Sequence, residues 1–376
     1  MKAKIVLIVL NDFTNDSRVL KEAISLQSLG HAVHVIALHG RDLSEHEVID
    51  GIPVRRVKLV SRPWSKVKLV QLLKYFEFFF RALFYCRHAD IVHCNDLNAL
   101  PIGVAAKILN LGRVKVVYDA HEYEIHRVSP TRRVNIAVNY MLERILIRFA
   151  DRVMTVSEAI ANEYVRLYRI RKPSLVLNCP PFSESKKRDV FRDRFGIRQD
   201  QIIVLYQGGL SKGRGIEILL QAFSELLDDK VVFVVMGYGP LESLVLEYQI
   251  KDARVFFHPA VSPRELLDYT SSADYGVLFY EDNCLNHRYC SPNKMFEYLM
   301  AGIPVLSSNL VEMKRLIEQN NIGVVAESND AEGFRRALAS LQAMDYESLV
   351  SRVKTVRRRY CWEEQEKVLV EVYHDL

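Results

Sequence analysis

No apolar run in this sequence is long enough to span a membrane, because a helix that crosses a bilayer needs about 20 consecutive apolar residues. The first apolar run, Ile5–Leu10, covers only six residues and is followed by polar Asn11 without a small-residue cleavage site, so it predicts a strand and not a signal peptide. The six cysteines are scattered and form no Cys-x-x-Cys pair, which favours reduced thiols and a cytoplasmic protein.

Proline is also scarce, with 12 in 376 residues, and no tract of low complexity or internal repeat interrupts the chain. A composition of 49% hydrophobic and 26% charged residues is typical of a globular protein. Since 376 residues exceed one ordinary core, we expect two domains. The rigid pair Pro180-Pro181 and the charge-rich stretch after it predict residues 1–180 and 181–355 as these domains, with residues 356–376 as a final helix.

Apolar runs of strand length alternate with helical patterns along both halves. The expected strands are 5–10, 32–38, 54–60, 91–94, 114–118 and 153–156, and then 202–206, 231–236, 255–257, 275–279, 305–307 and 323–325. Continuous apolar strands separated by helices indicate parallel sheets that are covered on both faces. The fold class is therefore α/β, with two Rossmann-like doubly wound domains, and we expect a ligand-binding cleft where their two sheets face each other.

Charge is distributed unevenly between the halves. Residues 1–180 carry 27 Lys or Arg against 17 Asp or Glu, whereas residues 181–376 carry 24 against 29. A basic half suits a partner rich in phosphate: nucleic acid, anionic lipid or a phosphorylated metabolite. The segment 62–88 adds six basic side chains and an aromatic cluster, which fits either a helix lying on an anionic membrane or a core helix with a basic solvated edge.

Four neighbouring residues, Cys86, His88, His93 and Cys94, include metal-ligand types. The predicted strand at 90–94 would point adjacent side chains to opposite faces of the sheet, so we expect no metal site there.

The second domain opens with a strand, a glycine-rich loop and the start of a helix, over Ile202–Ile216. Gly208 and Gly209 would let backbone N–H groups approach a phosphate, and Lys212 and Arg214 would supply positive charge. The loop lacks the residues of a P-loop and the spacing of a dinucleotide fingerprint, so a plain strand-to-helix turn is the alternative. A second glycine turn, containing Gly237, follows the next strand.

The stretch Ser291–Val305 predicts a short helix that begins at Ser291 and Pro292 and ends at Gly302. Its interior is apolar on nearly all sides, yet it contains Glu297. An ion pair with Lys294 or Arg288 is one explanation for this carboxylate. Hydrogen bonds to the two hydroxyls of a bound ribose are the other.

In the first domain, Asp119, His121 and Glu122 follow a predicted strand. Their place at the carboxyl end of a sheet makes His121 a candidate catalytic residue, although a lone histidine in a loop has no necessary function.

Four stretches together resemble the retaining glycosyltransferases of family four, which have the two-domain GT-B fold, and the resemblance covers nearly the whole chain. They are Asp119–Glu122, Gln207–Phe223, Met236–Pro240 and Ser291–Val305. The ending Arg359–Glu363 is also similar to the family's last helix, which returns to the N-terminal domain.

The resemblance implies that the first domain binds the acceptor and that the second binds a nucleotide-sugar donor, UDP- or GDP-linked. It assigns catalytic roles to His121, Arg214 and Glu297. It implies an acceptor site at Asn11, Asp12, Asp96 and Glu122, and a donor site at Gly208, Gly209, Lys212, Arg214, Gly237, Tyr289, Ser291, Pro292, Asn293, Lys294 and Glu297. No cofactor is implied and no metal is expected, because the sequence lacks the Asp-x-Asp pair with which the other major glycosyltransferase fold holds one.

Two departures from the family pattern matter. The family often has Arg where Gly209 stands. This chain therefore lacks one positive charge at the diphosphate site, unless Lys212 or Arg288 supplies it. It often has Glu where Tyr289 stands, and that Glu normally contacts the sugar, so the sugar is left open.

The alternatives are a nucleotide-sugar epimerase or phosphorylase of the same fold, and a non-catalytic protein that binds nucleic acid or anionic lipid. The last leaves Arg214 and Glu297 unexplained. Basic charge and the aromatic segment 62–88 favour a lipid-linked glycan acceptor at the cytoplasmic face of the membrane, in surface polysaccharide or glycolipid synthesis, and a free glycan is the alternative acceptor. Nucleic acid is not the expected partner.

Overall fold

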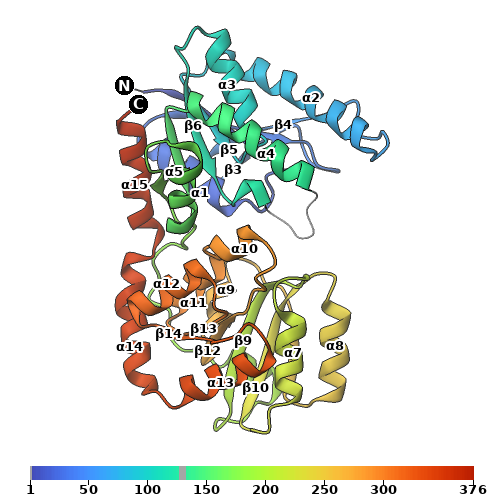
Figure 1. Ribbon diagram of the computed structural model, residues 1–376, viewed down its shortest axis with the longest axis vertical. Helices are drawn as coiled ribbons and strands as arrows, with labels where there is room; N and C mark the ends of the chain where they lie inside the picture. Colours follow the sequence, from blue (N-terminus) through green and yellow to red (C-terminus); the bar gives the residue numbers. More distant parts are fainter. Residues whose placement is uncertain (1, 127–132) are drawn as a thin grey trace. The chain divides into compact units, whose positions relative to one another are not determined.

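The computed structural model describes residues 2–126 and 133–376. Its chain forms two compact units, one of Met1–Val176 with Glu366–Leu376 and the other of Leu177–Gln365 (Figure 1). The passage from the first unit to the second thus lies beside the Pro180-Pro181 pair. The end of the chain returns to the first unit, and Glu366 is the first residue of the returning segment.

The first unit contains an eight-stranded sheet in the order β3-β4-β2-β1-β5-β6-β7-β8. All neighbours are parallel except β3 and β4. The strands are β1 (Lys4–Ile8), β2 (Ala32–Leu38), β3 (His46–Ile49), β4 (Ile52–Val57), β5 (Ile91–Asn95), β6 (Lys115–Ala120), β7 (Arg152–Thr155) and β8 (Ser174–Leu175).

Helices connect these strands. They are α1 (Ser17–Ser28), α2 (Lys68–Tyr85), α3 (Leu100–Leu109), α4 (Arg133–Leu146) and α5 (Glu158–Tyr168), with the short 3₁₀ helices η1 (Cys86–His88), η2 (Glu124–His126) and η3 (Ile147–Phe149). The last helix of the chain, α15 (Trp362–His374), contributes its C-terminal part to this unit.

The second unit contains a six-stranded, fully parallel sheet in the order β11-β10-β9-β12-β13-β14. Its strands are β9 (Ile202–Gly209), β10 (Val231–Tyr238), β11 (Val255–Pro259), β12 (Tyr275–Leu278), β13 (Val305–Ser307) and β14 (Gly323–Val325). Its helices are α6 (Val190–Phe195), α7 (Ile216–Ser224), α8 (Glu242–Lys251), α9 (Leu266–Thr270), α10 (Leu285–Tyr289), α11 (Asn293–Ala301), α12 (Val311–Asn320), α13 (Ala331–Gln342), α14 (Tyr346–Val356) and the 3₁₀ helix η4 (Arg357–Arg359).

Helices cover both faces of the second sheet, as the continuous apolar strands predicted. Along β9, Ile203 and Leu205 belong to the core that includes α11 and α12. The alternate residues Val204 and Tyr206 belong to the core that includes α7 and α13. Because successive side chains of a strand point to opposite faces, one apolar strand supplies two cores.

Strand order reverses direction once in each sheet, between β1 and β5 and between β9 and β12. Open parallel sheets bind ligands at the carboxyl ends of the strands at such a reversal. The doubly wound α/β architecture predicted from the sequence is confirmed, and it fixes where each unit would hold a ligand.

The antiparallel edge strand β3 was not predicted from the sequence. Asp50 and Gly51 form the turn between β3 and β4 with φ of +47° and +84°. Positive φ at both central residues is typical of a tight hairpin turn, for which Asp-Gly is a preferred pair. The exposed and polar character of His46–Ile49 hid this strand from a search for apolar runs.

Candidate active site

The glycine loop of the second unit lies at the carboxyl end of β9, beside the reversal in strand order. Gly208, the second-to-last residue of β9, has φ of +114°, and Gly215, with φ of +76°, directly precedes α7. A Cβ on Gly215 would lie 1.6 Å from the carbonyl oxygen of Phe279, and one on Gly237 would lie 1.9 Å from that of Gly208. These glycines are required because backbone segments touch at both positions.

Gly209 differs from its neighbours because a Cβ there would meet nothing within 4 Å. Space for a side chain therefore exists at this position. The adjoining positive charge comes from Arg214, whose Nη1 donates to Tyr280 Oη over 2.8 Å, and from Lys212, which is exposed. Arg288 does not supply the positive charge that is missing at Gly209, because its guanidinium forms two hydrogen bonds, of 2.9 and 2.7 Å, to the Asp282 carboxylate.

Glu297 lies in the middle of α11 and accepts a hydrogen bond of 2.6 Å from Gln207 Nε2. Gln207 is itself fixed, because its side-chain oxygen accepts from Thr270 Oγ1 over 2.8 Å. Lys294 and Arg288 were the ion-pair partners considered for Glu297, but Arg288 pairs with Asp282, and Lys294 Nζ has no hydrogen-bond partner in the described part of the chain. The structure thus holds the Glu297 carboxylate half-buried at the end of β9.

The start of α11 differs from the prediction. Pro292 is the residue that precedes the helix, and no side chain caps it. Ser291 is buried, and its hydroxyl lies 3.5 Å from the carboxylate of Glu312. Asn293, the first helical residue, is exposed, and Tyr289 ends the preceding helix α10. Gly302 ends α11 with φ of +83°, as predicted.

The first unit places a buried charged cluster at the carboxyl end of β6. Asp119 accepts two hydrogen bonds from Arg18, of 2.8 and 2.9 Å, and its Oδ2 also lies 2.9 Å from His121 Nε2. The backbone N–H of His121 donates to Asp96 Oδ1 over 3.2 Å. Two of the predicted site residues, His121 and Asp96, are therefore in contact.

These contacts determine the proton affinity of the histidine. Burial lowers the pKa of His121, but the carboxylates of Asp119 and Asp96 outweigh it and raise this pKa to about 9. Burial acts to raise the pKa of Asp119, and Arg18 and His121 nevertheless hold it well below the usual range. The arrangement therefore favours an imidazolium at His121 and a carboxylate at Asp119 near neutral pH.

Glu22 and His93 extend the cluster, and both are fully buried. Glu22 Oε1 lies 3.1 Å from Arg18 Nε, and its Oε2 lies 3.6 Å from His93 Nε2. His93 Nδ1 lies 2.6 Å from the hydroxyl of Tyr373 on α15. Burial raises the pKa of Glu22 to about 7 in spite of the nearby Arg18.

Arg18, Glu22 and Tyr373 were not predicted as site residues from the sequence, and His93 was considered there only as a metal ligand. The spacing of Arg18 and Glu22 was a signal in the sequence. These residues are one helical turn apart and in phase with the apolar positions of α1, so two charged side chains point into the core. Ligand atoms of Glu22, His93 and Asp119 lie within 4.8 Å of one another. The positive charge that these two acids require is already supplied by Arg18.

The other predicted acceptor residues form local contacts. Asn11 Nδ2 donates to Asp16 Oδ2 over 2.7 Å, and Asp12 accepts from Thr14 Oγ1 over 2.7 Å. Both residues follow β1, at the reversal in strand order of the first sheet. Glu122 is half-buried next to His121.

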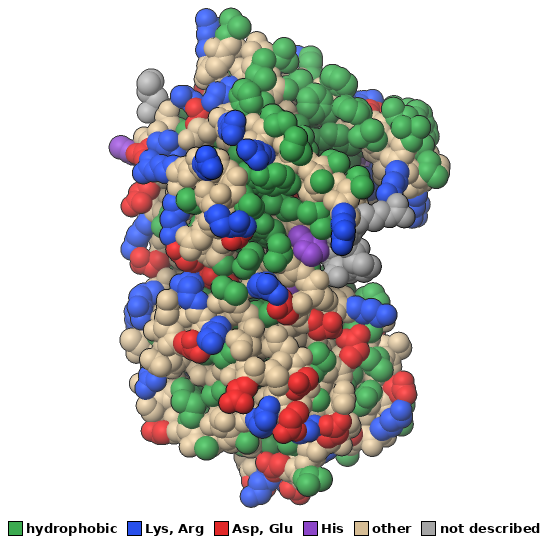
Figure 2. Space-filling model, viewed as in Figure 1, with side chains coloured by type: hydrophobic (Ala, Val, Ile, Leu, Met, Phe, Trp, Pro, Cys, Tyr) green, Lys and Arg blue, Asp and Glu red, His purple; other side chains and the backbone are tan. Residues whose placement is uncertain are grey.

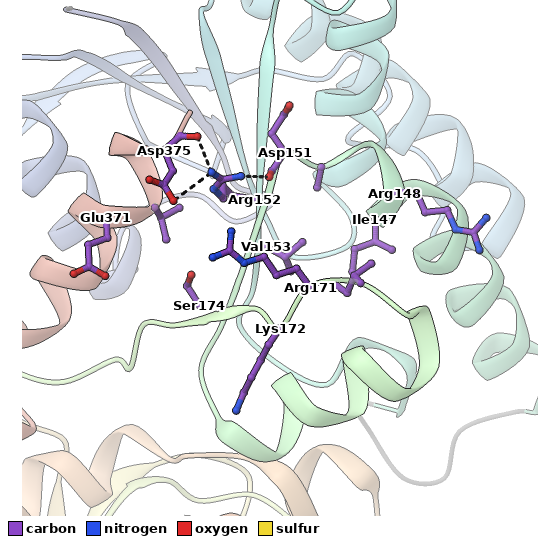
Figure 3. A pocket seen from close by; sticks show the side chains of 13 residues that line it. Ile147, Arg148, Asp151, Arg152, Val153, Arg171, Lys172, Ser174, Glu371 and Asp375 are labelled. Atoms are coloured by element: carbon purple, nitrogen blue, oxygen red, sulfur yellow. Dashed lines mark hydrogen bonds and ion pairs between the residues drawn. The ribbon is translucent and has the colours of Figure 1, made fainter.

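A pocket with a volume of about 360 Å³ is lined by residues of the first unit alone (Figure 3). Arg152, on its wall, donates to the backbone oxygen of Asp375 over 2.6 Å and joins the residue that follows α15 to β7. None of the predicted site residues lines this pocket.

Each of the two units matches a known protein family. Residues 17–180 match the family described as "Glycosyl transferase 4-like domain", and residues 201–343 match "Glycosyl transferases group 1". An uncharacterized glycosyltransferase of Methanocaldococcus jannaschii is 26% identical over 368 residues, which cover 92% of this chain and 90% of that protein.

Solved structures show the same fold. Sucrose-phosphate synthase from Thermosynechococcus elongatus has a TM-score of 0.81 at 18% identity and covers 99% of this chain and 98% of its own. Anabaena HepE in complex with UDP-glucose has a TM-score of 0.73 at 17% identity, over 100% of both chains. The fold is GT-B, and the chain belongs to glycosyltransferase family four. It is a glycosyltransferase.

Proposed function

We propose that this protein transfers a hexose from a UDP- or GDP-linked sugar to a glycan or a lipid-linked glycan, with retention of the anomeric configuration. The observation that carries the donor assignment is the Glu297 carboxylate, which Gln207 holds at the end of β9 over 2.6 Å. A carboxylate there can accept hydrogen bonds from both hydroxyls of one ribose. The UDP-glucose complex of the similar Anabaena protein supports a uridine nucleotide as the first donor to test.

The chemistry follows from charge. Cleavage of the glycosyl phosphate bond develops negative charge on the departing diphosphate. Arg214 and the amides of the glycine loop would stabilise that charge more in the transition state than in the ground state, and this difference accelerates the reaction. In this proposal protein cations replace a metal ion. His121, as an imidazolium beside Asp119, would act on the sugar, and Asn11, Asp12, Asp96 and Glu122 would contact the acceptor.

Thermal stabilisation by UDP-, GDP- and ADP-sugars tests the donor assignment. A ligand that binds only the folded protein raises its stability, by about 2.7 kcal/mol at a hundred times its dissociation constant. We expect a UDP- or GDP-sugar to raise the melting temperature and the free sugar to leave it unchanged. No shift with any nucleotide sugar would contradict the assignment. Incubating the protein with a labelled nucleotide sugar and no acceptor separates transfer from epimerisation, because an epimerase needs no acceptor to change the sugar.

We also propose that segment 62–88 contacts an anionic membrane, which would bring the enzyme to a lipid-linked acceptor in surface polysaccharide or glycolipid synthesis. In α2 only Phe78 and Ala82 are buried. Hydrophobic side chains gather over α2, α3 and α4 on the face seen in Figure 2. Large exposed ones in the segment are Trp64, Val67, Leu69, Leu72, Leu73, Phe76, Phe80 and Phe84. The described helices include none that is long and apolar enough to cross a membrane.

Sedimentation with liposomes tests this contact. Lys66 and Lys68 are exposed, whereas Lys74 donates to the backbone oxygens of Arg62 and Trp64 and should be left intact. Each basic side chain near an anionic surface contributes about 1 kcal/mol. We expect Lys66→Glu with Lys68→Glu to release the protein from anionic liposomes. The same charge change at Lys314 and Lys354, in the second unit, is the control, and binding to no liposome at low salt would contradict the proposal.

A further inference from the structure

Lys294, in the first turn of α11, is a buried amine without a hydrogen-bond acceptor. Its side chain is only 6% exposed, and its Nζ has no hydrogen-bond partner in the described part of the chain. A buried ammonium in this state is costly, because it has lost its hydration and gained no hydrogen bond in return. A structural role alone does not explain such a group, since a methionine of similar length would fill the space at lower cost.

The surroundings of Lys294 lead to the glycine loop. Its Nζ lies 3.8 Å from the ring centre of Tyr206 on β9 and 5.2 Å from that of Tyr280, which follows β12. A Cβ built on Gly208 would lie 3.7 Å from the same Nζ. The amine therefore lies directly beneath the bare backbone at the end of β9, between the two strands where the sheet reverses its order.

Several charged and titratable groups face this amine. Burial lowers the pKa of Lys294 well below its usual range, and Arg214 on the glycine loop lowers it further. Glu297, on the same helix, and Cys290, which follows α10, act in the opposite direction but do not restore it. The rings of Tyr206 and Tyr280 complete the shell. In the ligand-free protein, burial and Arg214 therefore favour the neutral amine more than in a free lysine.

We propose that Lys294 binds the diphosphate of the nucleotide and takes up one proton from solvent when it does so. This inference rests on the proposed function, because it requires a nucleotide at the glycine loop. The diphosphate would give the three N–H groups of Lys294 acceptors and would offset the charge of Arg214. Lys294 would thereby supply the positive charge that is missing at Gly209, from beneath the loop and not from its surface.

Calorimetric titration with UDP in buffers of different ionisation enthalpy measures this proton directly. Above about pH 8 the terminal phosphate of UDP is itself deprotonated, since its pKa is about 6, so uptake reports on the protein. We expect the wild-type protein to take up protons, and not to release them, when it binds UDP between about pH 8 and about pH 9. Uridine, which has no phosphate, should bind without uptake.

Lys294→Met provides the matched variant. It should bind UDP about ten- to a hundredfold more weakly, the range for a lost hydrogen bond to a charged group, and without proton uptake. Lys354→Met removes an exposed lysine of α14, outside the glycine loop, and should keep the uptake. The wild-type titration alone decides the matter if Lys294→Met does not fold.

Two results would overturn the role of Lys294 while leaving the proposed function intact: UDP binding with no dependence on buffer, or uptake that persists in Lys294→Met. Failure of UDP, GDP and ADP to bind at all would instead overturn the proposed function, and the Lys294 inference with it.

Discussion

The buried acid Glu22 should make the first unit less stable as the pH rises. Its pKa is raised by burial from 4.5 to about 7 in the folded protein. The folded state therefore binds the proton more tightly than the unfolded state does. The stabilisation from this proton is fully present below pH 4.5 and is lost as the pH rises through about 7.

The size of the effect follows from the same two values. One pH unit of difference in pKa corresponds to about 1.4 kcal/mol, so the shift of Glu22 corresponds to about 3 kcal/mol. Glu22→Gln imitates the protonated acid at every pH. We expect the variant to be as stable as wild type near pH 4.5 and about 3 kcal/mol more stable at pH 8.

Hydrogen exchange of the β6 backbone, measured by mass spectrometry at a series of pH values, reports the stability of the first unit separately from the second. Comparing variant and wild type at each pH cancels the intrinsic exchange rate. Glu371→Gln, which alters an exposed acid of α15, is the control and should follow wild type throughout. An equal pH dependence in Glu22→Gln and wild type between pH 5 and 8 would refute the reasoning.

Three further predictions concern single contacts. His121→Gln should cost about 3 kcal/mol below pH 6.5 and nothing above about pH 9 in the same exchange assay, because the raised pKa of His121 stabilises the folded state only while the imidazole is protonated. Gly237→Ala should destabilise the second unit by about 1–3 kcal/mol in urea unfolding, since its Cβ would meet the Gly208 carbonyl, whereas Gly209→Ala should be nearly neutral. Tyr298→Phe should cost about 1–3 kcal/mol in that assay, because the buried Tyr298 hydroxyl donates to the Leu205 carbonyl over 3.0 Å.

Much of the fold was predictable because parallel strands buried on both faces leave continuous apolar runs. The predicted strands 32–38, 305–307 and 323–325 have the observed limits. Other strands shifted by a few residues, because a strand ends where its backbone hydrogen bonds end and not where its apolar side chains end. Thus β9 continues through Gly208 and Gly209.

The site was predictable only in part. Sequence motifs identified Glu297 within a helix and His121 after a strand. The partner of Glu297, Gln207, and the partner of Asp119, Arg18, come from distant positions that only the sheet brings near. Lys294 was found as a residue of a motif, yet its burial beneath Gly208 depends on how α11 packs against β9. Contacts between distant segments leave no local pattern in a single sequence.

Transfer of a labelled sugar from the stabilising nucleotide sugar to glycan and lipid-linked acceptors, compared between wild type and Glu297→Ala, tests the central claim most directly. We expect Glu297→Ala to lose at least about a hundredfold in rate with an unchanged circular dichroism spectrum, because the variant would lack the two charge-assisted hydrogen bonds to the ribose that we propose. Glu318→Ala, at an exposed acid of α12, should keep the wild-type rate. Wild-type turnover by Glu297→Ala would contradict the account.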